Sequence, residues 1–337
     1  WMMRPVREWL LTHPLQSAWA TRWLRRLSSR LFWGPLATRV AALPFAREST
    51  MSIVPGPWAA ASRWSGNLDL RPILKRLGQT PFECATPSEL AAAGLNPRRI
   101  GQVCAHQAIS SHCAWFHIGQ PSYPMALLRL SKPPPVVWIH GDLELLSRKS
   151  LSVVGSRRCT PYGRGIASAL GRGCAERQAL LVSGGAHGID TAAHRGALDA
   201  GGPTVAVLAQ GLERDPGGDA GALLARIRRE DGLLLTERLP QEPATRWAFP
   251  RRNRLIAALG QATVVVEAGL RSGALYTAQA ALELGQDVYA VPGRIDTPAS
   301  QGSNALLLEG AIPLVRSAQV LSGLEREQGL AQRLSVA

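Results

Sequence analysis

The sequence predicts an α/β protein with a Rossmann-like, mostly parallel sheet covered by helices on both faces and preceded by a small helical domain. After Ser150, short runs of apolar residues alternate with segments long enough to be helices, such as 162–177 and 275–284. The apolar runs are continuous, which is typical of parallel strands buried on both faces. They occupy 151–154, 180–182, 204–208, 233–235, 263–266 and 288–291.

The segment from about 68 to 115 shows a helical pattern instead. Leu70 and Leu77 belong to an i, i+3, i+4, i+7 series of apolar residues, and Gly78 follows as a C-terminal glycine would. Thr86 is then followed by Pro87 and Glu89, the order of a capping box with proline at the first helical position. The spacing predicts a small domain of short helices.

These patterns predict five segments. The first segment, residues 1–50, has five of the ten tryptophans and eight arginines but only two acidic residues. Charges interrupt its apolar stretch too often for a signal peptide. A membrane-surface helix, a transit-like segment and sequence upstream of a start at Met51 are the alternatives for it, and we favour the last, or disorder. The segments are an atypical basic stretch at 1–50, the helical domain at 51–120, a Pro-rich linker leading into the core at 121–150, the Rossmann-like domain at 151–316 and a tail at 317–337 without a winged-helix domain.

The formal net charge of +14 favours a polyanionic partner, and nucleic acid is the leading candidate. The five cysteines form no CxxC pair and have no histidine beside them at metal-ligand spacing. We therefore expect reduced thiols in a cytoplasmic protein, with no bound metal and no cofactor. No apolar run approaches 18 residues, so we expect no membrane partner.

Glycine-rich turns follow the first two predicted strands, at the edge where parallel sheets bind ligands. After 151–154 come Gly155, Ser156 and Arg157, a small turn with an arginine that suits a phosphate but lacks the GxGxxG fingerprint. After 180–182, three glycines near a helix start favour an amide nest for an anion. This second turn contributes Ser183, Gly184, Gly185, His187 and Gly188. Asp190 and His194 lie four residues apart on the next helix, and we interpret them as structural.

The segment 246–256 carries the strongest functional signal. It places four arginines within nine residues, interleaves aromatic residues, and sets them at the start of a predicted helix at 251–259. Cations are disfavoured at a helix N-terminus, so the arrangement favours a bound anion. Arginine forks for phosphates and aromatic faces for bases are typical of single-strand binding. The candidate residues are Arg246, Phe249, Arg251, Arg252, Asn253 and Arg254.

A further small-residue turn, with Ser272 and Gly273, precedes the helix that carries Thr277. Turns at 292–294 and 301–304 follow the last long strand, so together the turns predict a polar groove along one sheet edge. No activated nucleophile, paired carboxylates or metal cluster is evident at this edge, which favours a binding protein over an enzyme. The alternative is a nucleotide-binding phosphoribohydrolase-like enzyme, for which Glu267 is the candidate acid, although we expect Glu267 to order its turn.

Many of these segments resemble the DNA-processing protein A family (DprA, also called Smf). The resemblance runs from about Tyr123 to Val315 and is carried by Val154–Arg157, Ser183–Asp190, Phe249–Arg254, Val266–Ala268, Ser272–Gly273 and Val291–Gly293. It implies an extended Rossmann fold, and the helical module before it resembles the family's SAM-like N-terminal domain. The resemblance further implies a cytoplasmic protein that binds single-stranded DNA, protects incoming DNA and loads the RecA recombinase during natural transformation. It also implies a homodimer, and it assigns DNA contacts to the Gly-Ser-Arg turn and to the Phe-Pro-Arg-Arg-Asn-Arg segment.

The sequence departs from the family pattern at several positions. His187 stands where the family usually has Arg or Lys, so we expect a weaker anion site at neutral pH. The 212–220 loop has Asp215 and Pro216 in place of a Tyr-Pro pair, and Thr236-Glu237-Arg238 replaces a Ser-Glu-Tyr pattern. These changes put partner contacts in doubt but leave the arginine cluster intact.

Overall fold

The structure is a computed structural model that describes residues 52–324. The basic segment expected at 1–50, the proposed start at Met51 and residues 325–337 of the expected tail lie outside the described residues. Among residues 52–324, no helix is both long enough and apolar enough to cross a membrane.

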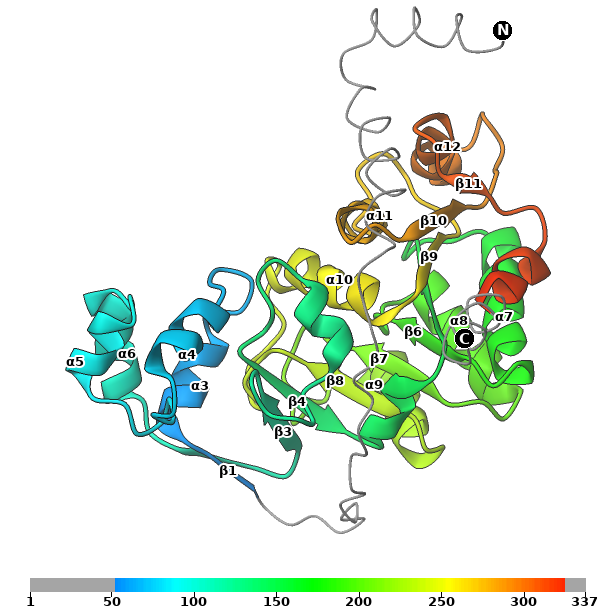
Figure 1. The fold of residues 1–337 in the computed structure, drawn as a ribbon. Helices are drawn as coiled ribbons and strands as arrows, with labels where there is room; N and C mark the ends of the chain where they lie inside the picture. The colour runs from blue at the N-terminus through cyan, green and yellow to red at the C-terminus, as the bar shows by residue number, and fades with distance from the viewer. Residues whose placement is uncertain (1–51, 325–337) are drawn as a thin grey trace, which may run out of the picture. The chain divides into compact units, whose positions relative to one another are not determined.

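The core is a sheet of nine strands that is parallel except at one edge (Figure 1). The strand order is β11-β10-β9-β5-β6-β7-β8-β4-β3, and only β4 and β3 run antiparallel to their neighbours. The strands are β3 (Ala114–His117), β4 (Val136–His140), β5 (Ser150–Val154), β6 (Leu180–Ser183), β7 (Thr204–Val207), β8 (Leu233–Thr236), β9 (Ala262–Val265), β10 (Asp287–Ala290) and β11 (Ile312–Pro313). The fold class predicted from the sequence is confirmed.

The order of strands reverses at β5. The chain adds β6, β7 and β8 on one side of β5 and then returns to add β9, β10 and β11 on the other. Leu151 accordingly pairs with Leu181 of β6 and with Ala262 of β9. The loops at the carboxyl ends of β5, β6 and β9 diverge at this switch point, where open α/β sheets bind ligands.

Helices cover both faces of the sheet. The helices of this domain are α7 (Pro161–Glu176), α8 (Ile189–Asp199), α9 (Gly218–Arg229), α10 (Ala248–Leu259), α11 (Ala274–Glu283) and α12 (Gln301–Leu308). On one face α7 and α8 pack against Leu151 and Val153. Glycines allow their close approach, because a Cβ on Gly171 would lie 2.1 Å from the carbonyl oxygen of Ala193.

Serine side chains on β5 fix α10 to the other face. The hydroxyl of Ser150 donates to the carbonyl of Leu259 at 2.7 Å, and that of Ser152 donates to the carbonyl of Ile256 at 2.7 Å. These carbonyls belong to the last turn of α10, where the carbonyl of Ile256 also accepts from the N–H of Gly260 at 3.2 Å. The two bonds therefore hold α10 above the strand whose end carries the Gly-Ser-Arg turn.

A small helical module precedes the sheet. It comprises β1 (Ser52–Val54), α3 (Gly56–Ser62), α4 (Arg71–Leu77), α5 (Pro87–Ala92), α6 (Pro97–Ala105) and β2 (Ile109–Ser111). The capping box at α5 is confirmed, since Thr86 Oγ1 accepts from the Glu89 N–H at 3.3 Å while Glu89 Oε2 accepts from the Thr86 N–H at 2.8 Å. The sequence analysis missed α3, whose buried Trp58 stacks on His117 of β3 at 4.0 Å.

Residues 121–150, expected as a Pro-rich linker into the core, contain a strand of the sheet itself. After a 3-10 turn, η1 (Met125–Arg129), the buried strand β4 pairs with β8, and a second turn, η2 (Leu143–Ser147), leads to β5. Directly before β4 stand three prolines, Pro133, Pro134 and Pro135. Proline cannot donate a hydrogen bond to a strand ladder and is tolerated only up to the first residue of a strand, so the paired strand begins after them. The proline content concealed the four-residue apolar run behind it.

Candidate nucleic-acid interface

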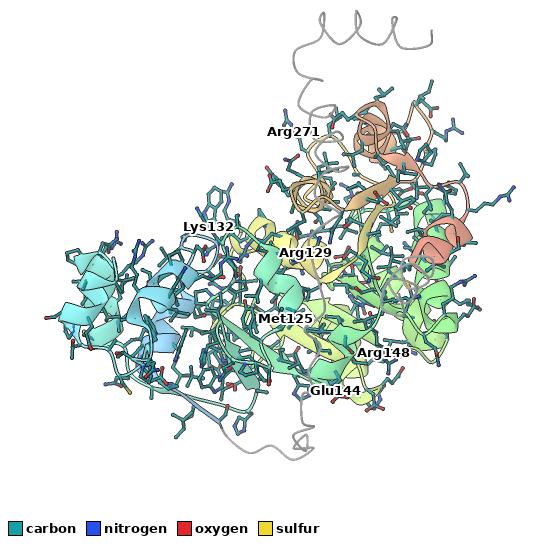
Figure 2. The ribbon with its side chains drawn as sticks, in the orientation of Figure 1. Met125, Arg129, Lys132, Glu144, Arg148 and Arg271 are labelled. Carbon is teal, nitrogen blue, oxygen red and sulfur yellow. The ribbon has the colours of Figure 1, made fainter. Side chains whose placement is uncertain are left out.

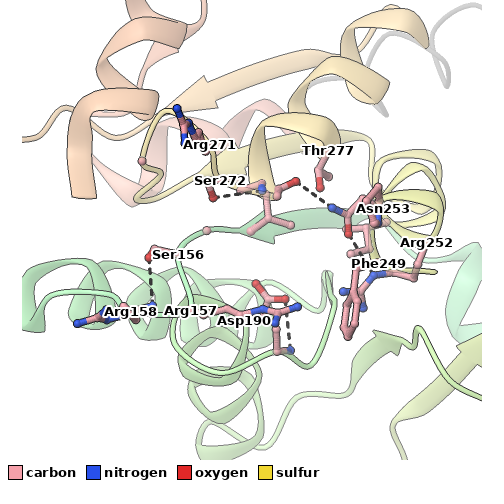
Figure 3. Close-up of a pocket in the computed structure, with 18 residues that line it drawn as sticks. Ser156, Arg157, Arg158, Asp190, Phe249, Arg252, Asn253, Arg271, Ser272 and Thr277 are labelled. Carbon is pink, nitrogen blue, oxygen red and sulfur yellow. Dashed lines mark hydrogen bonds between the residues drawn. The ribbon is translucent and has the colours of Figure 1, made fainter. Parts of the chain in front are cut away.

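Two neighbouring pockets open at the carboxyl edge of the sheet, at the switch point. The first, here called the α11 pocket, has a volume of about 450 Å³ and lies between the β5 turn, α10 and the start of α11 (Figure 3). The second, the β7 pocket, has a volume of about 320 Å³ and lies between the β6 turn, the end of β7 and the 214–216 loop. Arg157, Ala186, Phe249 and Arg252 line both.

Phe249 and Arg157 form the boundary between the two pockets. The guanidinium carbon of Arg157 lies 4.6 Å from the centre of the Phe249 ring, a cation–π distance. Arg157 comes from the turn after β5 and Phe249 from the first turn of α10. An aromatic face and a guanidinium plane at one point suit a flat heteroaromatic group with a phosphate beside it.

Arg252 forms the floor of both pockets and is almost fully buried, with 4 % of its surface exposed. Its guanidinium donates to the carbonyls of Gly184 (2.5 Å) and Val207, which lie at the ends of β6 and β7. Burial lowers the pKa of Arg252 to about 10, while the carboxylate of Asp190 opposes this shift. Arg252 therefore stays charged at neutral pH, fixes the two strand ends and supplies positive charge from below.

Asn253 connects α10 to the start of α11. Its side-chain amide donates to the carbonyl of Gly273 at 2.9 Å, and its oxygen accepts from Arg252 Nε at 3.1 Å. The dashed lines of Figure 3 follow this chain of contacts. Asn253 thus lines the α11 pocket and holds the turn that contains Ser272.

The glycine turn after β6 differs from the open amide nest that the sequence predicts. Asp190 Oδ2 accepts from the N–H groups of Gly184 (3.2 Å) and Ala186 (3.4 Å), so a side chain of the protein already occupies these donors. Burial raises the pKa of Asp190, and Arg252 counteracts that shift. The turn is therefore closed by its own carboxylate, which is the structural role that the sequence suggested for Asp190.

The remaining residues of this turn divide between support and pocket. Ser183 is fully buried and donates to the carbonyl of Val153 at 2.6 Å. Gly188, with φ +84°, approaches the β5 turn so closely that a Cβ would lie 2.3 Å from the carbonyl oxygen of Ser156. Gly185 and His187 line the β7 pocket. Two of the predicted residues thus shape the site from behind, and two face it.

The structure does not bring the four arginines of 246–254 together. Residues three or four apart share a helix face, so Phe249, Arg252 and Asn253 face the pockets while Arg251 and Arg254 face the other way. Arg254 pairs with Glu237 and bonds Ser65 of the helical module at 3.0 Å, and Arg251 lies against Gly66. Arg246 precedes α10 and stacks on the exposed Trp247 at 4.8 Å, outside both pockets.

Glu267, the candidate acid of the hydrolase alternative, is occupied by a structural contact. Its carboxylate accepts from the Thr160 N–H at 2.8 Å and from the Thr160 hydroxyl at 2.5 Å, at the start of α7. Only 3 % of Glu267 is exposed, and it does not line either pocket. It has the structural role that the sequence suggested, but the turn that it orders is the one before α7 and not its own.

Sequence reasoning missed several residues of the α11 pocket. Arg158 and Arg271 line its mouth, and the buried Thr277 lines its interior. The signal for Thr277 was present, because a threonine four residues after a Ser-Gly turn lies on the first turn of the following helix. No comparable sequence pattern marks three residues that line the β7 pocket, Leu208, Gln210 and Arg214.

Comparisons with known proteins agree with this architecture. Residues 114–325 match the family described as DNA recombination-mediator protein A. The putative DNA processing protein DprA of Mycobacterium tuberculosis is 47% identical over 190 residues, which are 56% of this chain and 49% of that protein. DprA of Streptococcus pneumoniae is 39% identical over 210 residues, 62% of this chain and 74% of that protein. The match thus spans about half the length of the mycobacterial relative.

Two solved structures are also similar. The X-ray structure of Streptococcus pneumoniae DprA gives a TM-score of 0.68 at 31% identity and covers 80% of this chain and 98% of that one. The Helicobacter pylori protein, described by its unique single-stranded DNA binding mode, gives a TM-score of 0.58 at 28% identity and covers 64% of this chain and 98% of that one. The match to the family, the shared sheet and the motifs at its edge show that the chain belongs to the DNA recombination-mediator protein A (DprA/Smf) family.

Proposed function

We propose that this chain binds single-stranded DNA at the α11 and β7 pockets. The observation that carries the proposal is the Arg157–Phe249 pair, which stands between two pockets at the switch point of the sheet. Two adjoining pockets separated by one ring suit two successive nucleotides of a polymer. Their bases must be unpaired to enter, which favours a single strand over a duplex.

The residues that line the pockets are the proposed DNA contacts. They are Gly155, Ser156, Arg157, Gly184, Gly185, His187, Phe249, Arg252, Asn253, Ser272 and Gly273. Ser183 and Gly188 support the turns behind them, and Arg246 is placed to meet a strand that continues past Trp247. Arg251 and Arg254 remain predicted contacts from the sequence, but their position against the helical module favours a structural role.

We propose binding without chemistry. Asp190 is paired with backbone N–H groups and lies near Arg252, while Glu267, the candidate acid, is bonded to Thr160, so neither of these two carboxylates is free to accept a proton from substrate. This arrangement argues against the phosphoribohydrolase-like alternative. Incubation with nucleoside monophosphates should release no base.

The proposed cellular role is that of the family. We propose that the protein, as a cytoplasmic homodimer, protects incoming single-stranded DNA and loads the RecA recombinase during natural transformation and recombination. The family description as a recombination mediator supports this role. Light scattering after gel filtration measures the dimer, and the rate of RecA filament nucleation on single-stranded DNA measures loading; an unchanged rate on addition of the protein would contradict it.

Fluorescence anisotropy with labelled oligo-dT and with a duplex of equal length tests DNA binding. We expect tighter binding of the single strand, with an affinity that falls as salt rises because phosphate contacts release counterions. Arg157→Ala should weaken binding and lower the salt slope by about one unit. Arg148→Ala is the matched control, because Arg148 is exposed and lines neither pocket (Figure 2). Equal affinities of wild type and Arg157→Ala at two salt concentrations would contradict the site.

A further inference from the structure

A buried hydroxyl in the α11 pocket has no partner. The side chain of Thr277 is fully buried, lines the pocket, and its Oγ1 makes no hydrogen bond. A helical threonine commonly donates to the carbonyl four residues earlier. Here that carbonyl, of Gly273, accepts from Asn253 instead. A buried polar group without a partner lowers stability, so a hydroxyl kept in this position suits a ligand that completes its bonding.

The first turn of α11 adds positive potential at the same place. The helix is ten residues long, no acidic residue lies in its first turn, and its N-cap, Gly273, provides no side-chain cap. The N–H groups of this turn are already bonded to Ser272 and Gly273, so the turn contributes the positive end of the helix dipole, which favours an anion. Arg271 and Arg158 add two guanidinium groups at the mouth of the pocket. The one carboxylate among the lining residues, Asp190, is directed to backbone N–H groups and counterbalanced by Arg252.

The wall of the pocket at Thr277 is formed by two packed helices. Ile256 of α10 and Ala274 and Thr277 of α11 line the pocket, and these two helices pack against each other, as Figure 3 shows. A strand that continued past Thr277 would have to pass between the helices, so a group at a strand end reaches this wall more readily than a group within a strand.

We propose that the α11 pocket binds the phosphate monoester of a nucleotide, with Thr277 Oγ1 and the first turn of α11 around the phosphate and the base beside Phe249. A monoester carries about −1.5 to −2 charges at pH 7 and three strong acceptor oxygens, whereas a phosphodiester within a strand carries one charge. The volume of about 450 Å³ falls within the range of small-ligand pockets. The monoester belongs to a phosphorylated strand end or to a free mononucleotide, and this inference rests on the proposed single-strand binding.

Competition experiments with the full chain test it. Labelled oligo-dT without phosphate groups at its ends is displaced by five competitors. Three are unlabelled oligo-dT with a 5′-phosphate, with a 3′-phosphate or with hydroxyl groups at both ends, and the other two are dTMP and thymidine. We expect at least one phosphorylated species to compete about tenfold better than its hydroxyl-terminated counterpart (for dTMP, thymidine), the effect of one hydrogen bond to a charged group. The preference should decline below about pH 6, where the monoester dianion takes up a proton and becomes a monoanion. An advantage of dTMP over thymidine assigns the site to free mononucleotides, and an advantage confined to phosphorylated oligonucleotides assigns it to strand ends.

Thr277→Val removes the hydroxyl at nearly constant shape and should abolish most of this preference, and Thr277→Ser should restore it. Thr263→Val is the matched control, because Thr263 has an equally buried and unpartnered hydroxyl in β9 outside the pocket. Neither valine variant should lower the Tm, since neither hydroxyl has a partner to lose.

Two results would overturn the inference. One is equal competition by phosphorylated and hydroxyl-terminated species, and the other is a preference that Thr277→Val leaves unchanged. Both leave the proposed function intact if the labelled strand still binds. A labelled strand that does not bind at all overturns the proposed function as well, and dTMP binding by calorimetry then decides whether the monoester site stands without it.

Discussion

Arg254 and Glu237 form an ion pair on the side of α10 that faces away from Phe249, and the helical module completes it. The Glu237 side chain is 5% exposed and that of Arg254 17%. Ser65 of the module donates to the same carboxylate oxygen, and Ser62 donates to the backbone carbonyl of Glu237 at 3.0 Å. Arg254 also donates to the carbonyl of Lys132, beside α10 in Figure 2, at 3.0 Å. One helix therefore presents the pocket residues on one face and binds the module with the other.

Arg254→Ala should strongly destabilise the protein. Removal of the guanidinium leaves the carboxylate of Glu237 buried without its cation, and breaking such a pair costs about 3 kcal/mol or more of unfolding free energy. Urea denaturation measures the loss. Arg294→Ala is the control, because the Arg294–Asp296 pair is exposed and its removal should cause no measurable change. An Arg254→Ala midpoint equal to that of Arg294→Ala would show that the pair does not stabilise the contact.

Most of the parallel sheet was predictable from the sequence, because strands buried on both faces read as continuous apolar runs. The predicted strand at 151–154, for example, differs from β5 by one residue. The antiparallel edge was not predictable in the same way. Strand β4 is five residues long and begins directly behind three prolines, so local composition indicated a linker while pairing with β8 made it a strand.

The residue types of the site were predictable from the sequence, but the directions in which the side chains point were not. Four arginines near one helix start indicated an anion site, yet only a structure shows that Arg252 donates to Gly184 and Val207 while Arg254 donates to Glu237. The hydrogen-bond partners of Arg254 are 17, 122 and 189 residues away along the chain. Long-range partners of this kind leave no local pattern, and the same holds for Asn253 and Gly273.

Arg251→Ala should leave the salt dependence of DNA binding unchanged. Arg251 is half-buried beside Gly66, and burial lowers its pKa while Glu237 opposes that shift. A guanidinium held there displaces no counterion from DNA on binding, so its loss leaves the salt slope unchanged. Each lost phosphate contact, by contrast, lowers the salt slope by about one unit. Anisotropy titrations at four salt concentrations measure the slope. A decrease equal to that of Arg157→Ala would return Arg251 to the DNA interface.

Phe249→Leu should weaken single-strand binding by about 1–3 kcal/mol, the typical contribution of a base stacked on an aromatic ring. Leucine keeps the apolar contact with the α11 and β7 pockets but loses the face on which Arg157 now lies at 4.6 Å. Phe249→Tyr keeps the ring and should bind within about threefold of wild type. Equal losses in both variants would indicate that the shape of the side chain matters and stacking does not.

Glu267→Ala should lower stability without revealing or removing a hydrolytic activity. Its carboxylate accepts from the backbone and the hydroxyl of Thr160, and leaving these donors unpaired costs about 1–3 kcal/mol. Denaturation of Glu267→Ala, Thr160→Val and the double variant measures the coupling between the two side chains. Base release from a nucleoside monophosphate by the wild type and not by Glu267→Ala would instead support the hydrolase alternative.

His194 should make the stability of the protein depend on pH below neutrality. Burial lowers its pKa to about 3, and Arg252 adds to that shift; Nδ1 lies 2.8 Å from the hydroxyl of Thr204. The unfolded chain binds a proton at this histidine near pH 6.5. Between pH 6.5 and 3 the unfolded state therefore holds one proton more, and the unfolding free energy falls by about 1.4 kcal/mol for each pH unit of acidification.

His194→Gln removes this titration, so its unfolding free energy should decline less steeply than that of wild type between pH 6 and pH 4. Urea denaturation at each pH measures both slopes, and their difference isolates His194. The buried Asp190, whose pKa is raised, titrates in the opposite sense, but it is present in both proteins and does not enter the difference. His112→Gln, at an exposed histidine, is the control for the substitution itself. Parallel slopes for wild type and His194→Gln would mean that the imidazole is protonated in the folded protein. Arg252 or the strands β6 and β7 would then have to shift to admit the charge.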